Sequence, residues 1–172
     1  MARNVEIKAR VRDEERIRDY MTSKGTRHET QHQRDVFFHA HHGRLKLRCF
    51  PDGTGVLVAY QRPDQSGPKM SDYTLAPVAD AGELETALSQ SLGIRGIVEK
   101  TREIAMVGQT RIHLDRVQGL GTFLELEVVL RPGQSDADGR AIAEELMREL
   151  GVAEEDLLDR AYMDMLEALG TS

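Results

Sequence analysis

The chain has 172 residues, of which 40% are hydrophobic and 30% charged; this composition suits one soluble globular domain over residues 1–172 and excludes a disordered chain. The net charge of −6 argues against a general nucleic-acid binder, and the single cysteine, Cys49, excludes a disulfide framework and a cysteine-based zinc cluster. No apolar run approaches the roughly 18–20 residues of a membrane helix, and the first residues show strand alternation instead of an apolar signal core, so we expect a cytoplasmic protein.

The first half of the sequence predicts mainly strands. Period-two alternation at 3–11 is followed by a helix at 12–25, which Gly25 ends. Four further strands, separated by turn signals such as "HAHHG" and "PDGTG", are predicted at 34–38, 44–50, 56–63 and 69–78.

The second half predicts a helix at 80–93, then three strands, then two helices. The strands are expected at 96–107, 110–117 and 122–130, and the last two helices at 136–150 and 154–169. Eight strands in hairpin order predict an antiparallel sheet or barrel with the helices packed on its outside.

Most of the predicted strands carry one apolar face and one charged face, because alternate residues of a strand share a face. The charged faces hold ten cations and four acids, a positive surplus in a chain whose total is negative. The cations are Lys8, Arg10, Arg44, Lys46, Arg48, Arg62, Lys69, Lys100, Arg102 and Arg111, and the acids are Glu6, Asp115, Glu125 and Glu127. A face exposed to solvent would be expected to carry a net negative charge, as the whole chain does. The positive surplus therefore favours charged faces that point into a closed barrel. An ordinary half-exposed sheet with no site is the alternative.

The predicted fold class is therefore α+β, a closed eight-stranded antiparallel β-barrel (tunnel) with a charged interior and helices packed outside. Confined Lys and Arg side chains bind phosphate oxygens, and a few carboxylates without thiols suit a hard cation such as Mg²⁺ or Mn²⁺. Together they indicate phosphoryl or nucleotidyl transfer on a small-molecule triphosphate. The negative exterior disfavours a nucleic-acid polymer as partner.

Six short segments occur in a characteristic order: "VEIKARV", "GRLKLR", "RPDQSGPKMSDY", "VEKTRE", "HLDRVQGLGTFLELEV" and "DLLDRAYMDML". In this order they resemble the CYTH family of class IV adenylyl cyclases and thiamine triphosphatases, the triphosphate tunnel metalloenzymes. The resemblance runs from about residue 3 to about residue 166 and looks closest to the class IV cyclase branch. It implies an eight-stranded tunnel that binds a triphosphate together with a divalent metal.

The resemblance also implies roles for matching positions. Glu6 and Lys8 stand in the family's N-terminal Glu-x-Glu-x-Lys signature, and with Glu127 they are the predicted catalytic residues. The predicted metal ligands are Glu6, Asp115, Glu125 and Glu127. The predicted triphosphate-binding residues are Lys8, Arg44, Lys46, Arg48, Arg62, Lys69, Lys100, Arg102 and Arg111. Asn4 replaces the signature's first glutamate and offers a carbonyl oxygen without charge. The sequence therefore leaves open whether the site holds one metal ion or two.

Three other positions carry expectations of their own. His113 shares the polar face with Asp115 and is expected to hydrogen-bond in the tunnel wall, while Cys49 has the parity of a packing residue. Tyr162, in the segment that matches the family's C-terminal motif, is expected either at the tunnel mouth or in helix packing.

Two reactions fit this tunnel. A class IV adenylyl cyclase converts ATP to cyclic AMP and pyrophosphate, whereas a triphosphatase hydrolyses inorganic triphosphate, a nucleoside triphosphate or thiamine triphosphate. We favour the cyclase on branch resemblance alone. A non-catalytic polyphosphate- or nucleotide-binding module is the remaining alternative, which Asn4 favours. The sequence leaves a homodimer open.

Overall fold

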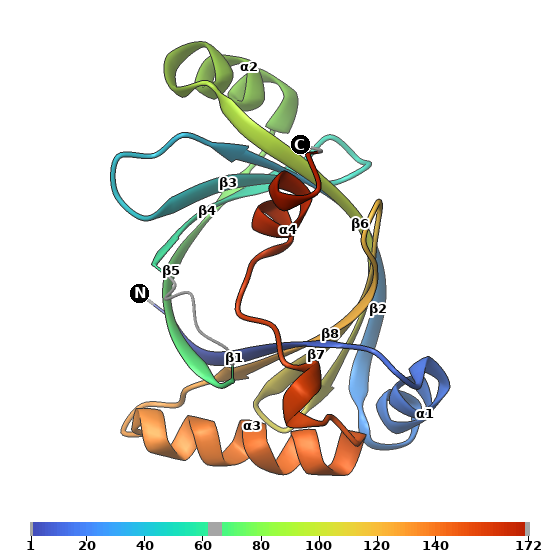
Figure 1. Cartoon of the computed structure of the whole chain (residues 1–172). Helices are drawn as coiled ribbons and strands as arrows, with labels where there is room; N and C mark the ends of the chain where they lie inside the picture. The colour runs from blue at the N-terminus through green and yellow to red at the C-terminus, as the bar shows by residue number, and fades with distance from the viewer. Residues whose placement is uncertain (1, 62–66, 171–172) are drawn as a thin grey trace.

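Eight antiparallel strands close into a ring, with helices on its outside (Figure 1). The computed structural model describes residues 2–61 and 67–170. The strands are β1 (Ala2–Arg10), β2 (Thr26–Phe38), β3 (Arg44–Cys49), β4 (Gly55–Gln61), β5 (Lys69–Val78), β6 (Ile94–Val107), β7 (Thr110–Val117) and β8 (Gly121–Val129). Around the ring their order is β1-β5-β4-β3-β2-β6-β7-β8, and every neighbouring pair is antiparallel. The predicted α+β fold with a closed antiparallel barrel is confirmed.

Four α-helices in the described part of the chain surround the ring. They are α1 (Glu14–Lys24), α2 (Ala81–Leu92), α3 (Asp136–Leu150) and α4 (Tyr162–Ala168). Helix α3 lies against β1 and β8, α1 against β2, β6 and β7, and α2 against β2 and β3. None of these described helices is both long enough and apolar enough to cross a membrane.

The register of the strands gives the ring two unlike faces. Ile112 on β7 and Leu126 on β8 are Cα partners, and both are fully buried in the outer core. Arg111 and Glu127, each one residue away, are also partners and line the interior. Because successive side chains of a strand point to opposite faces, closing the ring turns the charged face inward.

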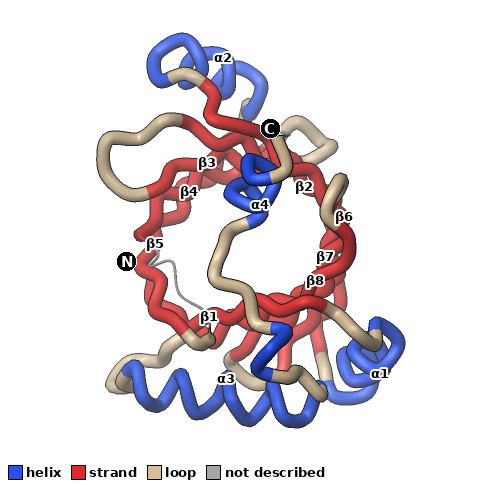
Figure 2. The backbone as a smooth tube through the Cα atoms, viewed as in Figure 1, coloured by secondary structure: helices blue, strands red, loops and turns tan. Residues whose placement is uncertain are grey.

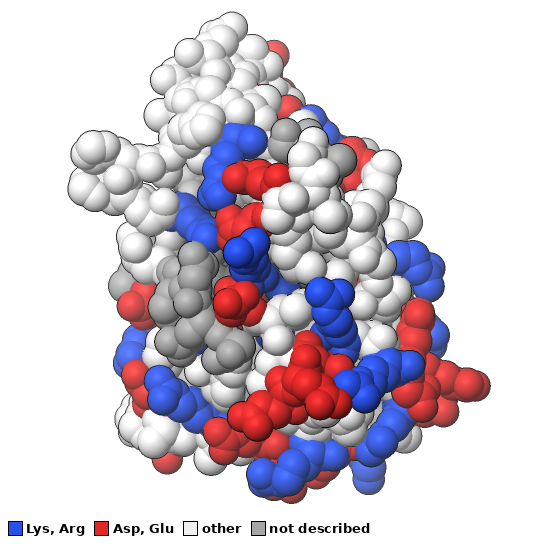
Figure 3. All heavy atoms as spheres, viewed as in Figure 1, with Lys and Arg blue, Asp and Glu red and all other residues white. Residues whose placement is uncertain are grey.

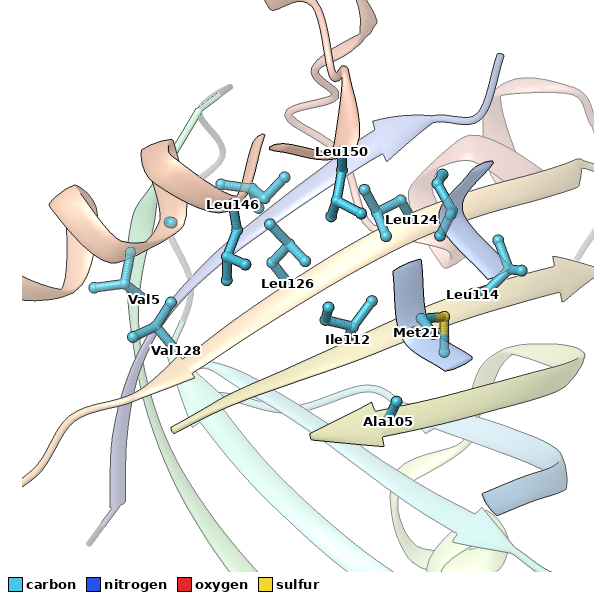
Figure 4. Close-up of a cluster of buried hydrophobic side chains, with 13 residues drawn as sticks. Val5, Met21, Ala105, Ile112, Leu114, Leu124, Leu126, Val128, Leu146 and Leu150 are labelled. Atoms are coloured by element: carbon cyan, nitrogen blue, oxygen red, sulfur yellow. The ribbon is translucent and has the colours of Figure 1, made fainter. Parts of the chain in front are cut away.

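The largest apolar cluster lies between the outer face of β1, β7 and β8 and the helices α1 and α3 (Figure 4). Leu124 and Leu126 of β8 pack there with Leu146 and Leu150 of α3. A second cluster seats α2 on β2 and β3, and a third seats α4 against the end of the ring. The helices therefore bury the outer face and leave the interior to polar chemistry.

Strand β2 begins at Thr26, eight residues before the predicted start at Arg34. Its first half pairs with β6 alone, since pairing with β3 starts only at Arg34 and Cys49. Most of residues 26–33 are exposed on both faces, so the sequence "TRHETQHQ" lacks the alternation that identifies a half-buried strand.

The predicted terminal helix at 154–169 is wrong. The chain forms a 3₁₀ turn at Glu154–Asp156, then an extended stretch at 157–161, and only then α4. We call residues 157–161 the C-terminal strap; it crosses one opening of the ring (Figure 2). Pairing between β1 and β5 ends at Glu6, and the strap uses the β1 edge beyond it: Leu157 bridges Ala9, and the Leu158 N–H donates to Lys8 O at 2.9 Å. These tertiary hydrogen bonds override the helical periodicity of the segment.

Helix α3 approaches β1 most closely at Gly139, where a methyl group would lie 2.6 Å from Val5 Cγ2 and 2.7 Å from Leu130 Cδ2. We therefore expect Gly139→Ala to lower the free energy of unfolding by about 1–3 kcal/mol through overpacking, despite the better helix propensity of alanine. Urea unfolding followed by circular dichroism measures the change. The control is Gly82→Ala in α2, where the nearest atom is Asp80 Oδ1 at 3.6 Å, so the variant should be neutral or slightly stabilised. Equal losses in both variants would contradict the close approach.

Candidate active site

The ring encloses a cavity of about 270 Å³. Of the residues predicted to bind triphosphate or metal, those that line it are Lys8, Lys46, Arg48, Lys100, Arg102, Arg111, Glu6, Glu125 and Glu127. Four other polar or aromatic residues of interest line it as well: Asn4, Asp35, His113 and Tyr162. Most residues of the predicted site therefore point into the ring, as the alternation of the strands predicted.

Asp35 on β2 gathers the cations of one wall. Its carboxylate accepts two hydrogen bonds from Arg48 and one from Lys100 Nζ, each at 2.8 Å, and Lys46 Nζ lies 3.5 Å from Oδ2. Burial acts to raise the pKa of Asp35, but the charges of Arg48, Lys100 and Lys46 hold this pKa well below its ordinary value. Asp35 is thus a fixed buried anion shared by three cations.

The cations of this wall also crowd one another. Burial, together with the nearby charges of Arg48, Arg102 and Lys46, lowers the pKa of Lys100 to about 7, against the opposing effect of Asp35. Burial and the charge of Arg48 also lower the pKa of Lys46. Crowded buried cations favour a bound anion, because it relieves their mutual repulsion.

A second group on β7 and β8 has the donor atoms of a metal site. His113, Glu125 and Glu127 each offer one ligand atom, and these three atoms lie within 4.8 Å of one another. His113 Nδ1 is buried, lies 3.6 Å from Glu125 Oε2, and has no hydrogen-bond partner among the described residues. Glu6 stands beside them as the Cα partner of Glu127. A divalent cation would satisfy the orphaned nitrogen and the carboxylates together, so this donor set fits one.

Both carboxylates of this group are ionised at neutral pH. Burial acts to raise the pKa of Glu127, but His113, Arg111 and Arg102 lower it to about 2. The charges of Lys8 and Arg102 likewise hold the pKa of Glu125 well below its ordinary range, against burial. The two side chains are therefore ready to hold a cation without losing a proton first.

Arg102 on β6 is held by two acids. It donates to both oxygens of Asp115 at 2.7 Å and to Glu125 at 3.2 Å, and the Tyr162 hydroxyl donates to Asp115 at 2.8 Å. Asp115 is 0% exposed and is not among the described residues that line the cavity. The geometry therefore supports Asp115 as the anchor of Arg102, and it does not support the metal-ligand role expected from the sequence.

The C-terminal strap holds two of the predicted triphosphate-binding lysines. Lys8 Nζ donates to Arg160 O at 3.2 Å and lies 3.8 Å from the centroid of the Tyr162 ring. Lys69 Nζ donates to Asp159 O at 3.3 Å and is completely buried. Tyr162 thus lies at the cavity wall, in contact with its charged groups.

Several predicted cations do not join the cavity. Arg44 pairs with Asp164 at 3.0 Å and borders a separate, smaller cavity, while Arg10 is exposed. Arg62 lies outside the described residues. On the face shown in Figure 3, Lys and Arg side chains lie beside Asp and Glu side chains around the opening of the ring. Among the described residues, the positive surplus of the interior is smaller than the sequence predicted, because Arg10 and Arg44 lie elsewhere and Asp35 adds an acid.

Asn4 is the inward residue that precedes Glu6 on β1. It is 3% exposed, it lines the cavity, and its Oδ1 has no hydrogen-bond partner among the described residues. An unsatisfied buried amide oxygen next to carboxylates is a suitable oxygen donor for a hard cation, and it adds no charge to the site.

Sequence reasoning missed Asp35 and the ligand geometry of His113. Asp35 lies in "RDVFF", where it shares the inner face with Phe37, and a lone acid in a mostly apolar strand was the available signal. The position of His113 among the acids depends on pairing between β7 and β8, which places it opposite Glu125.

The sequence matches the CYTH domain over residues 2–162. No curated protein sequence is detectably similar to the chain. Among solved structures, the PH1012 protein from Pyrococcus horikoshii OT3 superposes with a TM-score of 0.83 at 23% identity, covering 94% of this chain and 98% of that one. A Vibrio parahaemolyticus protein assigned provisionally as an adenylate cyclase gives 0.76 at 20% identity, over 95% and 97% of the two chains. HpAC1 from Hippeastrum, described as having a dominant triphosphatase activity, gives 0.66 at 16% identity, over 100% and 97%. At these identities the likeness shows a shared fold.

We expect Asp35→Asn to lower the free energy of unfolding by about 3–5 kcal/mol, because three cations lose their buried counter-charge. Inorganic triphosphate would replace that charge, so it should raise the melting temperature of the variant by more than that of the wild type. Thermal unfolding with and without the anion measures both effects. Asp19→Asn makes the same charge change at an exposed position of α1 and serves as control. Equal ligand-induced shifts in Asp35→Asn and wild type would rule out the counter-ion role.

A pKa of about 7 leaves Lys100 mostly neutral at pH 8, whereas a bound phosphate favours its charged form. Binding of inorganic triphosphate at pH 8 should therefore include proton uptake by Lys100, measured by titration calorimetry in two buffers of different ionisation enthalpy. Lys100→Arg is charged before binding and should lose this uptake. Lys24→Arg, at an exposed position of α1, should behave as wild type. Uptake unchanged in Lys100→Arg would assign the proton to another group.

Proposed function

The chain belongs to the CYTH domain family, and we propose that it is a divalent-metal-dependent enzyme that binds the triphosphate of a small-molecule substrate inside its ring of strands. Support comes from one feature of the cavity. Cations anchored by Asp35 face the same space as the donor atoms of His113, Glu125 and Glu127. A polyphosphate in this space would meet both the charges that neutralise its oxygens and the ligands of a cation that bridges them.

Two arginines of the cavity wall, Arg48 and Arg102, are oriented before any ligand arrives. Asp35 holds Arg48 and Asp115 holds Arg102, each through two hydrogen bonds of 2.7–2.8 Å. Fixed guanidinium groups stabilise charge that develops on phosphate oxygens without having to reorganise during the reaction. We propose that Lys8, Lys46 and Lys100 add charge around the same chain of phosphates, and that Lys69, which is completely buried, supports the site by holding the C-terminal strap.

We propose that Glu6, Glu125 and Glu127, together with His113, hold Mg²⁺ or Mn²⁺, and that Asn4 adds a neutral oxygen donor. When bound, the ion would supply Lewis acidity and charge neutralisation at the phosphate oxygens. Glu125 also lies 3.5 Å from Lys8 Nζ and 3.2 Å from Arg102 Nη2, so it would link the metal site to the cationic wall.

For the reaction we propose class IV adenylyl cyclase-like chemistry. The ribose 3′-oxygen of ATP attacks the α-phosphorus, the bond from this phosphorus to the β-phosphate bridging oxygen breaks, and cyclic AMP and pyrophosphate form. Hydrolysis of a terminal phosphate by water is the second candidate, because the Hippeastrum protein of the same fold is described as mainly a triphosphatase. A neutral Asn4 in place of an acid is compatible with a third outcome, binding without turnover.

Product analysis separates these candidates. The protein is incubated with ATP, inorganic triphosphate and thiamine triphosphate, each with Mg²⁺ or Mn²⁺. Cyclic AMP with pyrophosphate supports the cyclase, and free phosphate supports the hydrolase. Tight binding of a triphosphate without any product would overturn the enzymatic proposal, and failure to bind any triphosphate would overturn the proposed site.

We expect Glu127→Gln to weaken Mn²⁺ binding by at least about tenfold, since it removes a charged ligand and keeps the side-chain shape. Calorimetry or electron paramagnetic resonance of Mn²⁺ measures the affinity, and metal-dependent turnover should fall in parallel. Glu144→Gln, at an exposed position of α3, is the matched control. Wild-type affinity for Mn²⁺ in Glu127→Gln would remove this residue from the metal site.

A further inference from the structure

Tyr162, the first residue of α4, reaches the charged interior of the ring from the C-terminal segment. The residue lines the cavity and is buried, and its ring packs against Phe123 of β8 with the two centroids 5.2 Å apart. Met163 and Leu166 of α4 belong to the same buried apolar cluster. These contacts hold the Tyr162 ring in one place, because closely packed neighbours leave a buried ring little room to turn.

The hydroxyl of Tyr162 contacts the acid that orients Arg102. It donates to Asp115 Oδ2 at 2.8 Å, and the same oxygen accepts a hydrogen bond from Arg102 Nη2 at 2.7 Å. Arg102 Nη2 also donates to Glu125, a proposed metal ligand, at 3.2 Å. Two carboxylates therefore share one guanidinium group. The carboxylate of Asp115 cannot rotate away from Arg102 without losing its bond to the tyrosine hydroxyl as well.

The ring of Tyr162 contacts the cations directly. Lys8 Nζ lies 3.8 Å from the ring centroid, and Lys100 Nζ lies 5.8 Å from it. The face of an aromatic ring attracts a cation through its quadrupole. This attraction holds an ammonium group without adding a negative charge, so the charge of the lysine remains effective toward a phosphate.

We propose that Tyr162 is a positioning residue of the site: its hydroxyl fixes Arg102 through Asp115, and its ring holds Lys8 for the phosphates. This inference rests on the proposed function, because it assumes that these cations bind the triphosphate. Both actions come from a residue that directly follows the C-terminal strap, so docking of the C-terminal segment completes the arrangement of the cations. The two actions use different atoms of one side chain, and substitutions can therefore separate them.

The first test concerns the hydroxyl and needs no ligand. Tyr162→Phe removes the hydroxyl and keeps the ring, so the pair between Arg102 and Asp115 should open about fivefold more often, as expected for the loss of one buried hydrogen bond. Nuclear magnetic resonance of the arginine side chains in the full chain measures this opening as faster exchange of the Arg102 Nε–H with water.

Two controls accompany this measurement. The Nε–H of Arg48, which donates to Asp35 in another part of the cavity wall, should exchange at the wild-type rate in Tyr162→Phe. Tyr20→Phe removes a hydroxyl that is bonded to Glu149 outside the ring, and it should leave the exchange of Arg102 unchanged. A general loosening of the fold would change both controls.

The second test concerns the ring and measures binding of inorganic triphosphate with a chelator present. Tyr162→Leu should weaken binding about fivefold, because Lys8 loses its aromatic partner, whereas Tyr162→Phe should stay within about twofold of the wild type. With metal and the triphosphate that product analysis identifies as substrate, Tyr162→Phe should lower kcat about tenfold and leave KM nearly unchanged, since a less fixed Arg102 stabilises developing charge less well. Tyr162→Phe changes one atom and should fold even if Tyr162→Leu does not.

The possible failures have different meanings. Exchange of the Arg102 Nε–H at the wild-type rate in Tyr162→Phe would overturn the positioning of Arg102. Wild-type affinity for inorganic triphosphate in Tyr162→Leu would overturn the holding of Lys8. Either result leaves the proposed function intact, whereas failure of the wild type to bind any triphosphate would overturn the proposed function itself.

Discussion

A closed ring with charge inside needs its inward charges balanced, and here the strand register balances many of them. Five cross-strand Cα pairs on the inner face join an acid to a cation: Asp35–Arg48, Arg102–Asp115, Arg111–Glu127, Lys8–Glu125 and Glu6–Lys69. Opposite charges directly across a sheet attract, and a slip of one residue would turn every inner side chain outward. The pairing that closes the ring therefore balances much of its interior and brings the acids Glu6 and Glu127 together at the candidate metal site.

Alternation alone accounts for much of what could be predicted. The parity of β1, β3, β6, β7 and β8 placed inward, in that order of strands, the following residues, which line the cavity: Glu6, Lys46, Lys100, Arg111 and Glu127. Three features escaped because tertiary contacts decide them. The first half of β2 is exposed to solvent on both faces, so no alternation of apolar and polar residues identifies it as a strand. The C-terminal strap pairs with the edge of β1 beyond Glu6, and the position of this edge depends on where β5 begins. The counter-charge of Asp35 depends on strands that meet only in the closed ring.

The interior is divided into regions of different chemistry. Crowded cations lie on β3 and β6 around Asp35, donor atoms for a metal lie on β7 and β8, and an apolar surface lies on β4 and β5. Each region is built from the inward residues of a few neighbouring strands, and Glu125 connects the metal donors to the cations through Lys8 and Arg102. This separation suits a ligand whose own parts differ in charge and polarity.

The contacts of the C-terminal strap form late during synthesis of the chain. β1 is made first, yet it pairs with β8, which is more than a hundred residues later in the chain, and with the strap at Leu157. Lys8 and Lys69 therefore acquire their backbone carbonyl partners, Arg160 O and Asp159 O, only when the last segment of the domain has left the ribosome. Pairings this distant in sequence form slowly, since the loop between them must close first. Lys8 already lies 3.5 Å from Glu125 and Lys69 is already the Cα partner of Glu6, so the strap adds carbonyl acceptors to lysines that the strands have placed beside acids.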